Sequence, residues 1–494
     1  MITKNLKTKI IDFESGTIPI VVLNEDYAKE NGIYSFDRVL INFQGKKSIG
    51  LVHLSEEYIK ENEVGLYAEF VELIGVRKGC LVELIPTSKP KSIDFIRKKL
   101  FGQKLSYVEI DEIIKDTVNH SLSDVELAFF VSAIQTGNMT LNETRDLTLS
   151  MVKNGQVLDF GKELILDKHC IGGVPNNRTT MLAVPILSAM GYKIPKLSSR
   201  AISSPSGTAD TMEAISNVNV DVVKIKKQIK EIGGCIAWGG AFNIAGADDY
   251  LIKVRKSLRL DPEALLISSI LAKKKAAGSN VLLIDIPFGK GSKIGTKKQA
   301  MQLKRHFLQI GKAIGIKTGV VLTNGTQTVG SGVGPILEAI DVVRILKREN
   351  GPRDLEDKSL FLVKELLGLA GVKKSINELR TFLDSGKPWE WFKKIIISQN
   401  GDLDKLNDLT PSKIMHVVKA KKAGRVDFID NKRIVKIARY AGSPKDNGAG
   451  LFLHKKVGSV VSKGEPLFTI YSEQNHKLVR AVLEEKNFPA FNII

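Results

Sequence analysis

The chain has 494 residues, of which 43% are hydrophobic and 26% charged, a composition typical of soluble globular proteins. At about 150 residues a domain, this length allows roughly three domains with hydrophobic cores of their own. The longest nearly unbroken apolar stretch, residues 181–190, is about half of the roughly 20 residues that a membrane-spanning helix needs, and the first residues lack the apolar segment of a signal peptide. We therefore expect a cytoplasmic protein without a membrane partner.

The charge balance is strongly basic, with 73 Lys and Arg against 54 Asp and Glu and a formal net charge of +19. Residues 1–90 carry 11 basic and 13 acidic side chains, so the excess lies in the rest of the chain. Such a surplus can attract nucleic acid, concentrate a phosphorylated small substrate, or form a merely solvated lysine-rich surface. Composition alone does not choose among these three.

Three cysteines, Cys80, Cys170 and Cys235, show no paired spacing, and none of the seven histidines has the spacing of metal ligands. A disulfide framework and a metal cluster are therefore both unsupported. The GxSxG motif of serine hydrolases does not occur either. We expect a protein of a reducing compartment that needs no metal and no organic cofactor.

Two regions of different periodicity make up the first third of the chain. Residues 1–88 alternate short β-rich runs with turn residues and end in the proline-containing segment PTSKPKS, so we expect an N-terminal β-rich module followed by a linker. Residues 89–157 have helical periodicity, with two runs that open on cap-like residues. We expect a helical subdomain here, joined by residues from about 245 to 280.

The remaining chain changes pattern twice. Residues 158–345 contain apolar runs such as VLLIDIPFG and TGVVLTNG that pass into glycine-rich loops and then into helical patterns, the rhythm of a parallel α/β sheet. Residues 346–410 are expected to form a helical connection, and residues 411–494 return to the short strands and turns of a C-terminal α+β domain. The predicted fold class is α/β with a helical subdomain, plus an N-terminal β-rich module and a C-terminal α+β domain.

The segment ELILDKHCIGGVPNNRTT joins a predicted strand, ending at Asp167, to a helix that begins near Thr179. The loop between them is expected to carry Lys168 and the pair Gly172-Gly173. Glycines let backbone N–H groups approach an oxyanion, a helix N-terminus adds partial positive charge, and a lysine adds a full one. The pattern predicts an anion-binding loop. A tight turn would also account for the glycines, because the dinucleotide and Walker spacings are both absent.

A second segment, KLSSRAISSPSGTADTMEAI, is rich in hydroxyl groups. It carries Ser198, Ser199, Arg200, Ser203, Ser204, Ser206 and Thr208, followed by Asp210. Hydroxyls together with one guanidinium can hydrogen-bond phosphate and sugar oxygens from several directions. The alternative is a solvated loop, which would need neither this density of hydroxyls nor the arginine.

A third segment, RLDPEALLISSILAKKKAAG, opens on Asp261 before Pro and Glu, the pattern of a helix N-cap with proline at the first helical position. Ser269 and Lys273 are four residues apart in that helix and share a face, which indicates a polar helix edge near the cap. Two glycine loops follow, GKGSKIG with Lys293 and NGTQTVGSGVGP. None is specific alone, but together these loops could line one cleft.

The segment SSRAISSPSGTADTME is similar to the signature of the thymidine and pyrimidine-nucleoside phosphorylase family, and DKHCIGGV resembles the phosphate loop of that family. GGCIAWGGAFNIAGADD and LRLDPEALLISSILAKKKAAGS resemble its longer branch. That branch includes archaeal AMP phosphorylases and bacterial proteins described as thymidine phosphorylases, and it has an extra N-terminal β module. The similarity runs in order from about residue 90 to about residue 490. It implies a helical domain with a larger α/β domain and assembly as a homodimer or larger homo-oligomer.

The resemblance implies phosphorolysis of the N-glycosidic bond of a nucleoside, of the thymidine type, or of a nucleoside 5′-monophosphate, of the AMP type. Inorganic phosphate is then a co-substrate, the products are the free base and a pentose 1-phosphate or ribose 1,5-bisphosphate, and no nucleic acid partner is expected. The implied catalytic residues are Asp261, as proton donor, and Lys168. The implied phosphate-binding residues are Lys168, Cys170, Ser198 and Thr208. The implied nucleoside- or nucleotide-binding residues are Gly173, Ser199, Arg200, Ala201, Ile202, Ser203, Ser204, Thr208, Ser269, Lys273 and Lys293.

Several positions depart from the family pattern. Cys170 stands where the shorter branch has serine, which leaves a weaker hydrogen-bond donor. Asn324 and Thr328 stand where relatives carry aspartate and proline. An ungapped match puts Val254 where pyrimidine-specific members have a base-binding arginine, with Arg255 one place away. The base, the sugar and the need for a 5′-phosphate therefore stay open.

Two other functions also stay open. A phosphoribosyltransferase would share the helical-plus-α/β architecture but use a diphosphate donor and magnesium, and the sequence shows no evident carboxylate cluster for that magnesium beside the glycine loop. A basic nucleic-acid-binding protein descended from the enzyme would interleave basic and aromatic residues, whereas aromatic residues are only 6% of the chain.

Overall fold

The computed structural model describes residues 4–16, 18–137, 139–201, 204–242, 244–258 and 260–494. The chain forms two compact units. The first comprises Met1–Gly155 and Ala245–Ala272, and the second comprises Gln156–Ile244 and Lys273–Ile494. Each unit is therefore built from two stretches of chain, and helix α11 (Glu263–Ala276) contributes residues to both.

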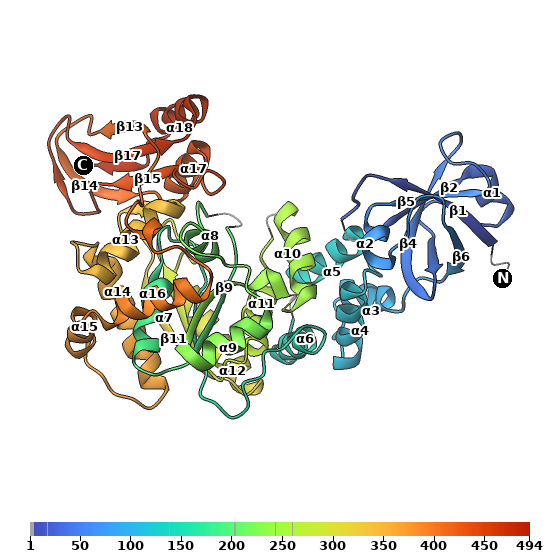
Figure 1. Cartoon of the computed structure of the whole chain (residues 1–494), viewed down its shortest axis with the longest axis horizontal. Helices are drawn as coiled ribbons and strands as arrows, with labels where there is room; N and C mark the ends of the chain where they lie inside the picture. The colour runs from blue at the N-terminus through green and yellow to red at the C-terminus, as the bar shows by residue number, and fades with distance from the viewer. Residues whose placement is uncertain (1–3, 17, 138, 202–203, 243, 259) are drawn as a thin grey trace. The chain divides into compact units, whose positions relative to one another are not determined.

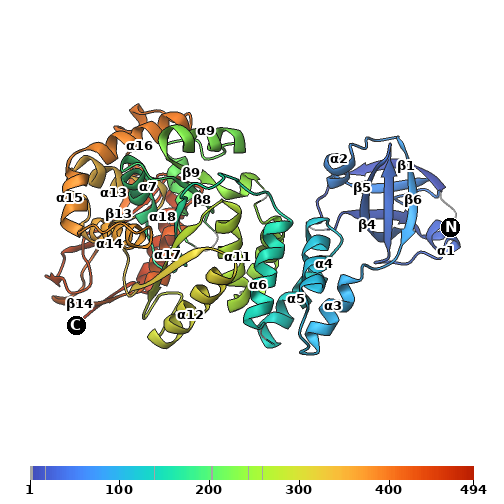
Figure 2. The same ribbon diagram turned by 90° about the horizontal axis from the view of Figure 1, so that it is seen from below.

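The first unit opens with a closed barrel of six strands, coloured blue in Figures 1 and 2. Around the barrel the strands follow the order β1 (Lys4–Ile11), β5 (Glu63–Tyr67), β2 (Ile20–Asn24), β4 (Lys46–Ser55), β3 (Arg38–Phe43) and β6 (Leu81–Thr87), and two short helices, α1 (Glu25–Glu30) and α2 (Glu69–Ile74), follow β2 and β5. The pairs β1·β5 and β2·β4 are parallel, and the other neighbours are antiparallel. Apolar side chains such as Val21, Leu23 and Ile41 fill the interior without exposed surface. Because the barrel closes, its strands present no free edge to solvent.

A helical bundle completes the first unit. It consists of α3 (Ser92–Leu100), α4 (Tyr107–Val118), α5 (Asp124–Gly137), α6 (Leu141–Lys153), α10 (Gly246–Leu258) and the first part of α11. Ser106 and Thr140 cap α4 and α6 in reciprocal capping boxes with the glutamates three residues later. Ile110, Phe130 and Leu251 lie in the shared core of the bundle. The helical subdomain that the sequence predicts is therefore present, and the segment after residue 245 belongs to it.

Glu143 of the capping box at Thr140 also belongs to a buried ion pair. Its Oε1 lies 2.7 Å from Lys99 Nζ and accepts a hydrogen bond of 3.0 Å from Leu105 N–H. The exposed fractions of the Lys99 and Glu143 side chains are only 2% and 3%. Removing one partner of such a pair leaves an uncompensated charge in the core.

We predict that Lys99→Ala lowers the free energy of unfolding by about 3–5 kcal/mol, the usual cost of leaving one charge of a buried pair without its partner. Lys98→Ala is the matched control. Lys98 pairs with Glu109 of the other capping box, but 34% of its side chain is exposed, so the loss should stay within about 1 kcal/mol. Denaturant unfolding of both variants checks this, and equal losses would contradict it.

The second unit holds the parallel α/β sheet. Strands β7 (Leu166–Cys170), β10 (Val281–Phe288) and β11 (Lys317–Asn324) form a parallel sheet in the order β11-β10-β7, and β8 (Ile194–Ser198) pairs in parallel with β9 (Gly234–Trp238). The helices of this part are α7 (Thr179–Ala189), α8 (Thr208–Glu213), α9 (Val222–Ile232), α12 (Lys297–Ala313), α13 (Pro335–Lys347), α14 (Arg353–Leu369), α15 (Ile376–Asp384) and α16 (Lys387–Ser398), with short 3₁₀ turns at Gly239–Phe242 and Asp404–Leu406. Nearly every side chain of α7 is buried, because it packs against α14, α16 and strand β9. The predicted α/β sheet is confirmed.

The C-terminal α+β domain completes the second unit. One antiparallel sheet has the order β12 (Gly332–Val333), β15 (Gly450–Leu453), β17 (Pro466–Ser472), β13 (Ile414–Lys419), and another has the order β16 (Val460–Val461), β14 (Gly424–Ile429), β18 (Phe491–Ile493). Helices α17 (Asn431–Ala441) and α18 (Asn475–Asn487) pack against each other and on β17. Strand β12 comes from the glycine-rich segment after β11, so this domain incorporates part of a predicted site loop.

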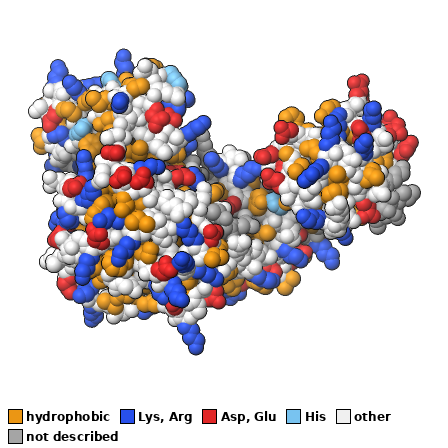
Figure 3. Space-filling view, viewed as in Figure 1, with side chains coloured by type: hydrophobic (Ala, Val, Ile, Leu, Met, Phe, Trp, Pro, Cys, Tyr) orange, Lys and Arg blue, Asp and Glu red, His pale blue; other side chains and the backbone are white. Residues whose placement is uncertain are grey.

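The excess of positive charge is dispersed on the face shown in Figure 3. Lys and Arg side chains lie over all parts of that face, with Asp and Glu side chains among them. This face therefore has the character of a mixed charged surface rather than a single basic stripe.

Candidate active site

Lys168 is the central charge of the candidate site. The sequence prediction placed it in a loop after a strand ending at Asp167, and this is wrong. Strand β7 continues to Cys170, because Lys168, His169 and Cys170 pair in register with Leu283, Ile284 and Asp285 of β10. The side chain of Lys168 is 2% exposed, and its ammonium donates a hydrogen bond to the hydroxyl of Thr179, the first residue of α7. Burial lowers the pKa of Lys168 from 10.5 to about 8.

Cys170 lies beside a carboxylate that sequence reasoning missed. Asn177 Nδ2 donates to Cys170 Sγ at 2.9 Å and lies 3.4 Å from Asp285 Oδ2. Burial raises the pKa of the Cys170 thiol to about 11, so the sulfur is uncharged at neutral pH. A neutral thiol does not repel an approaching anion, which a thiolate would do.

Asp285 itself is fully engaged. Thr323 Oγ1 donates to Asp285 Oδ1 at 2.5 Å, and Lys358 Nζ lies 3.0 Å from Oδ2. Burial works against ionisation, but Lys358 and Lys168 hold the pKa of Asp285 below its ordinary value. The signal that could have revealed it is a single acid inside the otherwise apolar run VLLIDIPF.

A second cluster of buried charges surrounds Asp167, the residue directly before Lys168 in β7. Asp167 Oδ2 is 2.7 Å from Lys274 Nζ, and its Oδ1 is 3.4 Å from Lys196 Nζ. Burial lowers the pKa of Lys196 well below its ordinary value. Burial likewise lowers the pKa of His169 well below 6.5, with the nearby lysines adding to the effect. His169 is therefore a neutral ring in this cationic region.

The glycine pair after β7 is required by its conformation and by its neighbours. Gly172 and Gly173 both have φ of +90°, a region that side chains other than glycine rarely adopt. A Cβ on Gly173 would lie 2.5 Å from the backbone nitrogen of Lys293. The structure thus brings two predicted site residues, Gly173 and Lys293, into direct contact.

The hydroxyl-rich loop follows strand β8, which ends at Ser198. Asp210 Oδ2 accepts hydrogen bonds from Ala201 N–H at 2.6 Å and from Gly207 N–H at 2.7 Å, which folds the loop back on the start of α8. Ser204 Oγ donates to the carbonyl of Ser206 at 2.9 Å. The predicted site residues Ile202 and Ser203 lie outside the described residues, and Ser199 is described and exposed.

The guanidinium group of Arg200 makes contacts with two side chains. It forms a bidentate ion pair with the carboxylate of Glu213, in which Arg200 Nη2 lies 2.7 Å from Glu213 Oε1. The guanidinium carbon lies 4.7 Å from the ring centroid of Trp238, the last residue of β9. This combination of a bidentate ion pair and a cation–π contact fixes the plane of the guanidinium.

Arg178 links the glycine loop to the hydroxyl loop, and sequence reasoning missed it. Its Nη1 donates to Thr208 Oγ1 at 2.7 Å and its Nη2 to the carbonyl of Ser206 at 2.8 Å, while its Nε forms a buried ion pair with Glu338. Burial raises the pKa of Glu338. Because Thr179 follows Arg178 directly and contacts Lys168, the structure brings Lys168 and Thr208 into one polar cluster.

The predicted residues of the first unit form a separate network. Asp261 Oδ1 lies 3.1 Å from Arg255 Nη1, Arg255 Nη2 lies 3.9 Å from Asp248 Oδ1, and Ser269 Oγ donates to Asp248 Oδ2 at 2.6 Å. Val254 packs in the core of the helical bundle with 6% exposure. Helix α11 begins at Glu263 rather than directly after Asp261, so the prediction of proline at the first helical position is wrong by one residue. Lys273, of the same helix, lies in the second unit.

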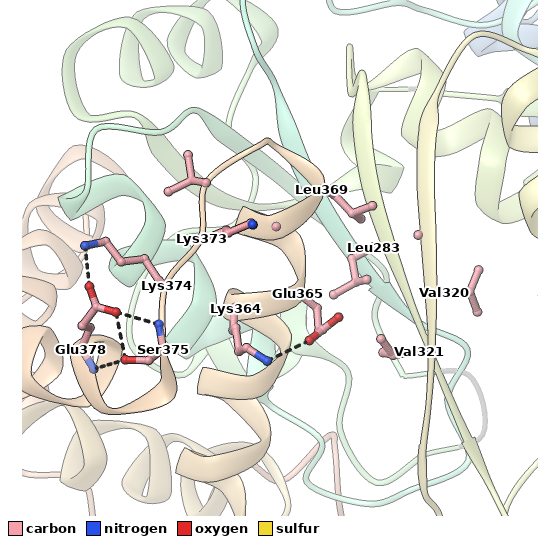
Figure 4. Close-up of a pocket in the computed structure, with 13 residues that line it drawn as sticks. Leu283, Val320, Val321, Lys364, Glu365, Leu369, Lys373, Lys374, Ser375 and Glu378 are labelled. Carbon is pink, nitrogen blue, oxygen red and sulfur yellow. Dashed lines mark hydrogen bonds and ion pairs between the residues drawn. The ribbon is translucent and has the colours of Figure 1, made fainter.

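A cavity of about 710 Å³ lies away from these residues (Figure 4). It is lined by β10, β11, α14 and the start of α15, and by none of the predicted site residues that the structure describes. Two of its lysines are paired, Lys374 with Glu378 at 2.9 Å and Lys364 with Glu365 at 3.5 Å, as the dashed lines in Figure 4 show. The cavity lies beside the strands rather than beyond their carboxyl ends, where ligands of parallel sheets bind.

Within the described ranges, no three His, Cys, Asp or Glu side chains gather in a way that could hold a metal ion. No helix in the same ranges is long and apolar enough to cross a membrane.

Three domain families match the chain. They are the helical bundle domain of a glycosyl transferase family over residues 93–155, the a/b domain of that family over residues 162–262, and the pyrimidine nucleoside phosphorylase C-terminal domain over residues 425–487. The barrel of residues 4–87 lies outside these matches.

Similar proteins cover nearly the whole chain. AMP phosphorylase 1 of Archaeoglobus fulgidus is 40% identical over 474 residues, which are 96% of this chain and 94% of that protein. AMP phosphorylase of Thermococcus kodakarensis is 41% identical over 485 residues, 97% of this chain and 95% of that protein. The chain therefore belongs to the thymidine and pyrimidine-nucleoside phosphorylase family, as the sequence motifs predicted, and it is an enzyme of the glycosyltransferase type.

A solved structure shows the same fold at lower similarity. Anthranilate phosphoribosyltransferase from Thermus thermophilus is 19% identical, with a TM-score of 0.53 over 62% of this chain and 100% of that chain. This likeness concerns the fold alone.

The buried ammonium of Lys168 generates a pH prediction. Its pKa of about 8 means that it is charged below that pH and neutral above it. We predict that the affinity for sulfate, whose charge does not change in this range, stays level up to about pH 7 and falls as pH rises through about 8. Isothermal titration of sulfate between pH 6 and 10 checks this. Lys168→Met should bind sulfate weakly at every pH, and a variant that keeps the decline would remove Lys168 from the anion site.

Proposed function

We propose that the protein catalyses the phosphorolysis of a nucleoside 5′-monophosphate, with AMP as the first substrate to test. Phosphate attacks the anomeric carbon, the N-glycosidic bond breaks, and the base and ribose 1,5-bisphosphate are released. The observation that supports this most is the buried ammonium of Lys168, hydrogen-bonded to Thr179 beside the glycine loop, in a chain about 40% identical to AMP phosphorylases over nearly its full length. Such an ammonium is a preorganised partner for an anion.

The phosphate-binding group of the proposal is Lys168, Cys170, Ser198 and Thr208. The contacts of Arg178 with Thr208 and of Asn177 with Cys170 support this group, since they hold two of its members in fixed places. The reaction passes through an oxocarbenium-like sugar, which an anion held close to the ring stabilises. Cys170 offers a neutral S–H donor there, weaker than a hydroxyl.

The nucleotide-binding residues of the proposal are those that the family resemblance implies. They are Gly173, Ser199, Arg200, Ala201, Ile202, Ser203, Ser204, Thr208, Ser269, Lys273 and Lys293. Arg200, with its plane fixed by Glu213 and Trp238, is suited to a phosphate or sugar oxygen. The contact of Gly173 with the backbone of Lys293 supports a shared role for their loops.

Asp261 is the proposed proton donor to a departing purine. A pyrimidine could instead leave as an anion stabilised by the cation of Lys273. The position that would carry a base-binding arginine in pyrimidine-specific members holds Val254, which is packed in the bundle core. This favours a purine over thymidine as the base. The adjacent Arg255 is engaged by Asp261.

We further propose that the enzyme acts in nucleotide salvage in the cytoplasm, as a homodimer or larger homo-oligomer, with phosphate as co-substrate and without a metal or organic cofactor. The family resemblance supports the role in salvage, the assembly and the phosphate co-substrate, and the spacing of the cysteines and histidines supports the compartment and the lack of a cofactor. Sedimentation of the full chain measures the oligomeric state directly.

The proposed function predicts which substrates release a base and under which condition. Incubated with AMP, CMP, UMP, thymidine or uridine, the protein should release a base only when phosphate is present, and fastest from AMP. Chromatography of the base and of ribose 1,5-bisphosphate measures this. Release of adenine without phosphate would contradict phosphorolysis, and turnover that requires a diphosphate-activated ribose with magnesium would identify a phosphoribosyltransferase instead.

The second prediction concerns Asp261. An amide cannot donate the proton that a departing adenine requires, so Asp261→Asn should lower kcat for AMP by roughly 10²- to 10⁴-fold, the usual span for removing a general acid. AMP binding should change little. Glu263→Gln removes one negative charge two residues away and should keep nearly normal turnover. Equal turnover of both variants and the parent protein would exclude Asp261 as the donor.

A further inference from the structure

Two site loops of the second unit rest on each other. The segment of residues 289–295 follows β10 and contains Lys293, and the segment of residues 324–330 begins at the last residue of β11. Gly325 N–H donates to the carbonyl of Phe288 at 2.9 Å, and a Cβ on Gly325 would lie 2.8 Å from Ser292 Cβ. The position of one segment therefore restricts the position of the other.

The C-terminal domain contacts the segment of residues 324–330 through Asn431, the first residue of α17. Asn431 is 1% exposed, and its Nδ2 donates to the carbonyl of Gly325 at 3.0 Å. Its side chain is not what caps α17, because Asp430 accepts from Lys432 N–H and Arg433 N–H in that role. The buried amide of Asn431 thus serves the neighbouring loop rather than its own helix.

Phe428 of β14 holds the other loop. Lys290 Nζ lies 4.3 Å from the centroid of its ring, within cation–π distance. Gly291 has φ of +86°, and a Cβ there would lie 3.5 Å from Phe428 Cζ and 3.7 Å from Asn431 N. The ring therefore supports residues 290 and 291 of the segment that carries Lys293.

The same segment reaches the anion site on its other side. The backbone of Lys293 lies against Gly173, where an added Cβ would come within 2.5 Å of Lys293 N. Gly173 belongs to the loop directly after Lys168 and Cys170. A continuous series of contacts within the second unit therefore leads from Phe428 and Asn431 through the Lys293 segment to the glycine loop.

We propose that Asn431 and Phe428 are positioning residues for the Lys293 segment, so that the C-terminal α+β domain takes part in substrate binding. The kinetic side of this inference rests on the proposed function. A segment that binds the nucleotide equally in the ground state and the transition state affects KM and leaves kcat unchanged. Loosening it should therefore weaken binding of the nucleotide more than it slows the chemical step.

The kinetic test uses the full chain. Asn431→Ala should raise KM for AMP about 3- to 10-fold, the effect of losing one hydrogen bond, with less than a 2-fold change in kcat. Phe428→Leu should raise KM for AMP by a similar factor. Phe428→Tyr keeps the aromatic face for Lys290 and should have the KM of the parent protein. Asn475→Ala is the matched control, because Asn475 is the exposed first residue of α18 in the same domain and should change neither constant.

Hydrogen–deuterium exchange gives a readout that does not need activity. In Asn431→Ala, peptides covering residues 289–295 and 324–330 should exchange faster than in the parent protein, and peptides covering β13 and β17 should exchange at the parent's rate. In Asn475→Ala, all of these peptides should exchange at the parent's rate. Unchanged exchange in both loops, or faster exchange throughout the C-terminal domain, would overturn the inference. Faster loop exchange with an unchanged KM would overturn the part that concerns the substrate. If the parent protein cleaves no nucleotide, the proposed function fails, and the exchange result alone decides whether these residues position the loop.

Discussion

Burying the ammonium of Lys168 inside strand β7 is the constraint on which the polar structure of the second unit depends. An ammonium removed from water loses much of its hydration, and the depressed pKa of about 8 shows that its surroundings compensate only in part. The hydroxyl of Thr179 accepts one hydrogen bond from it. The carboxylate of Asp285 also attracts this ammonium, but it is shared with Lys358 and Thr323. An anion bound at this place would supply the missing negative charge.

The other buried carboxylates around Lys168 also form ion pairs. Asp167 pairs with Lys274 and Lys196, and Glu338 pairs with Arg178. Each of these buried carboxylates therefore has a cation of the protein as its partner. Pairs of this kind are costly to break, because either partner alone would be a buried uncompensated charge. They fix the strand ends and the two loops around Lys168. Lys168 itself lies near the carboxyl end of its strand, the side of the sheet on which parallel α/β proteins bind substrates.

The sequence predicted the parts of the site that depend on local pattern. The glycine pair, the hydroxyl loop and the helix start at Thr179 could be found because each is encoded within a few consecutive residues. The strand end could not, because Asp167 is tolerated inside the strand through its pairing with Lys196 and with Lys274, which lies 107 positions away. Arg178 and Glu338 were missed for the same reason: single charged residues in different elements become partners only through the packing of α7, α8 and α13. Likewise, the alternation of apolar residues predicted the strands of the N-terminal module but not their closure into a barrel, which long-range pairing decides.

The contact of Arg200 with Trp238 gives the molecule an optical property. The chain has three tryptophans, and the other two, Trp389 and Trp391, both lie on α16. The indole of Trp238 lies under the guanidinium of the hydroxyl loop, so its emission depends on whether that charge stays over the ring. With phenylalanine at positions 389 and 391, the remaining fluorescence would come from this one ring alone. The protein would then carry a built-in spectroscopic probe of its own loop, readable in solution without a label or a coupled assay.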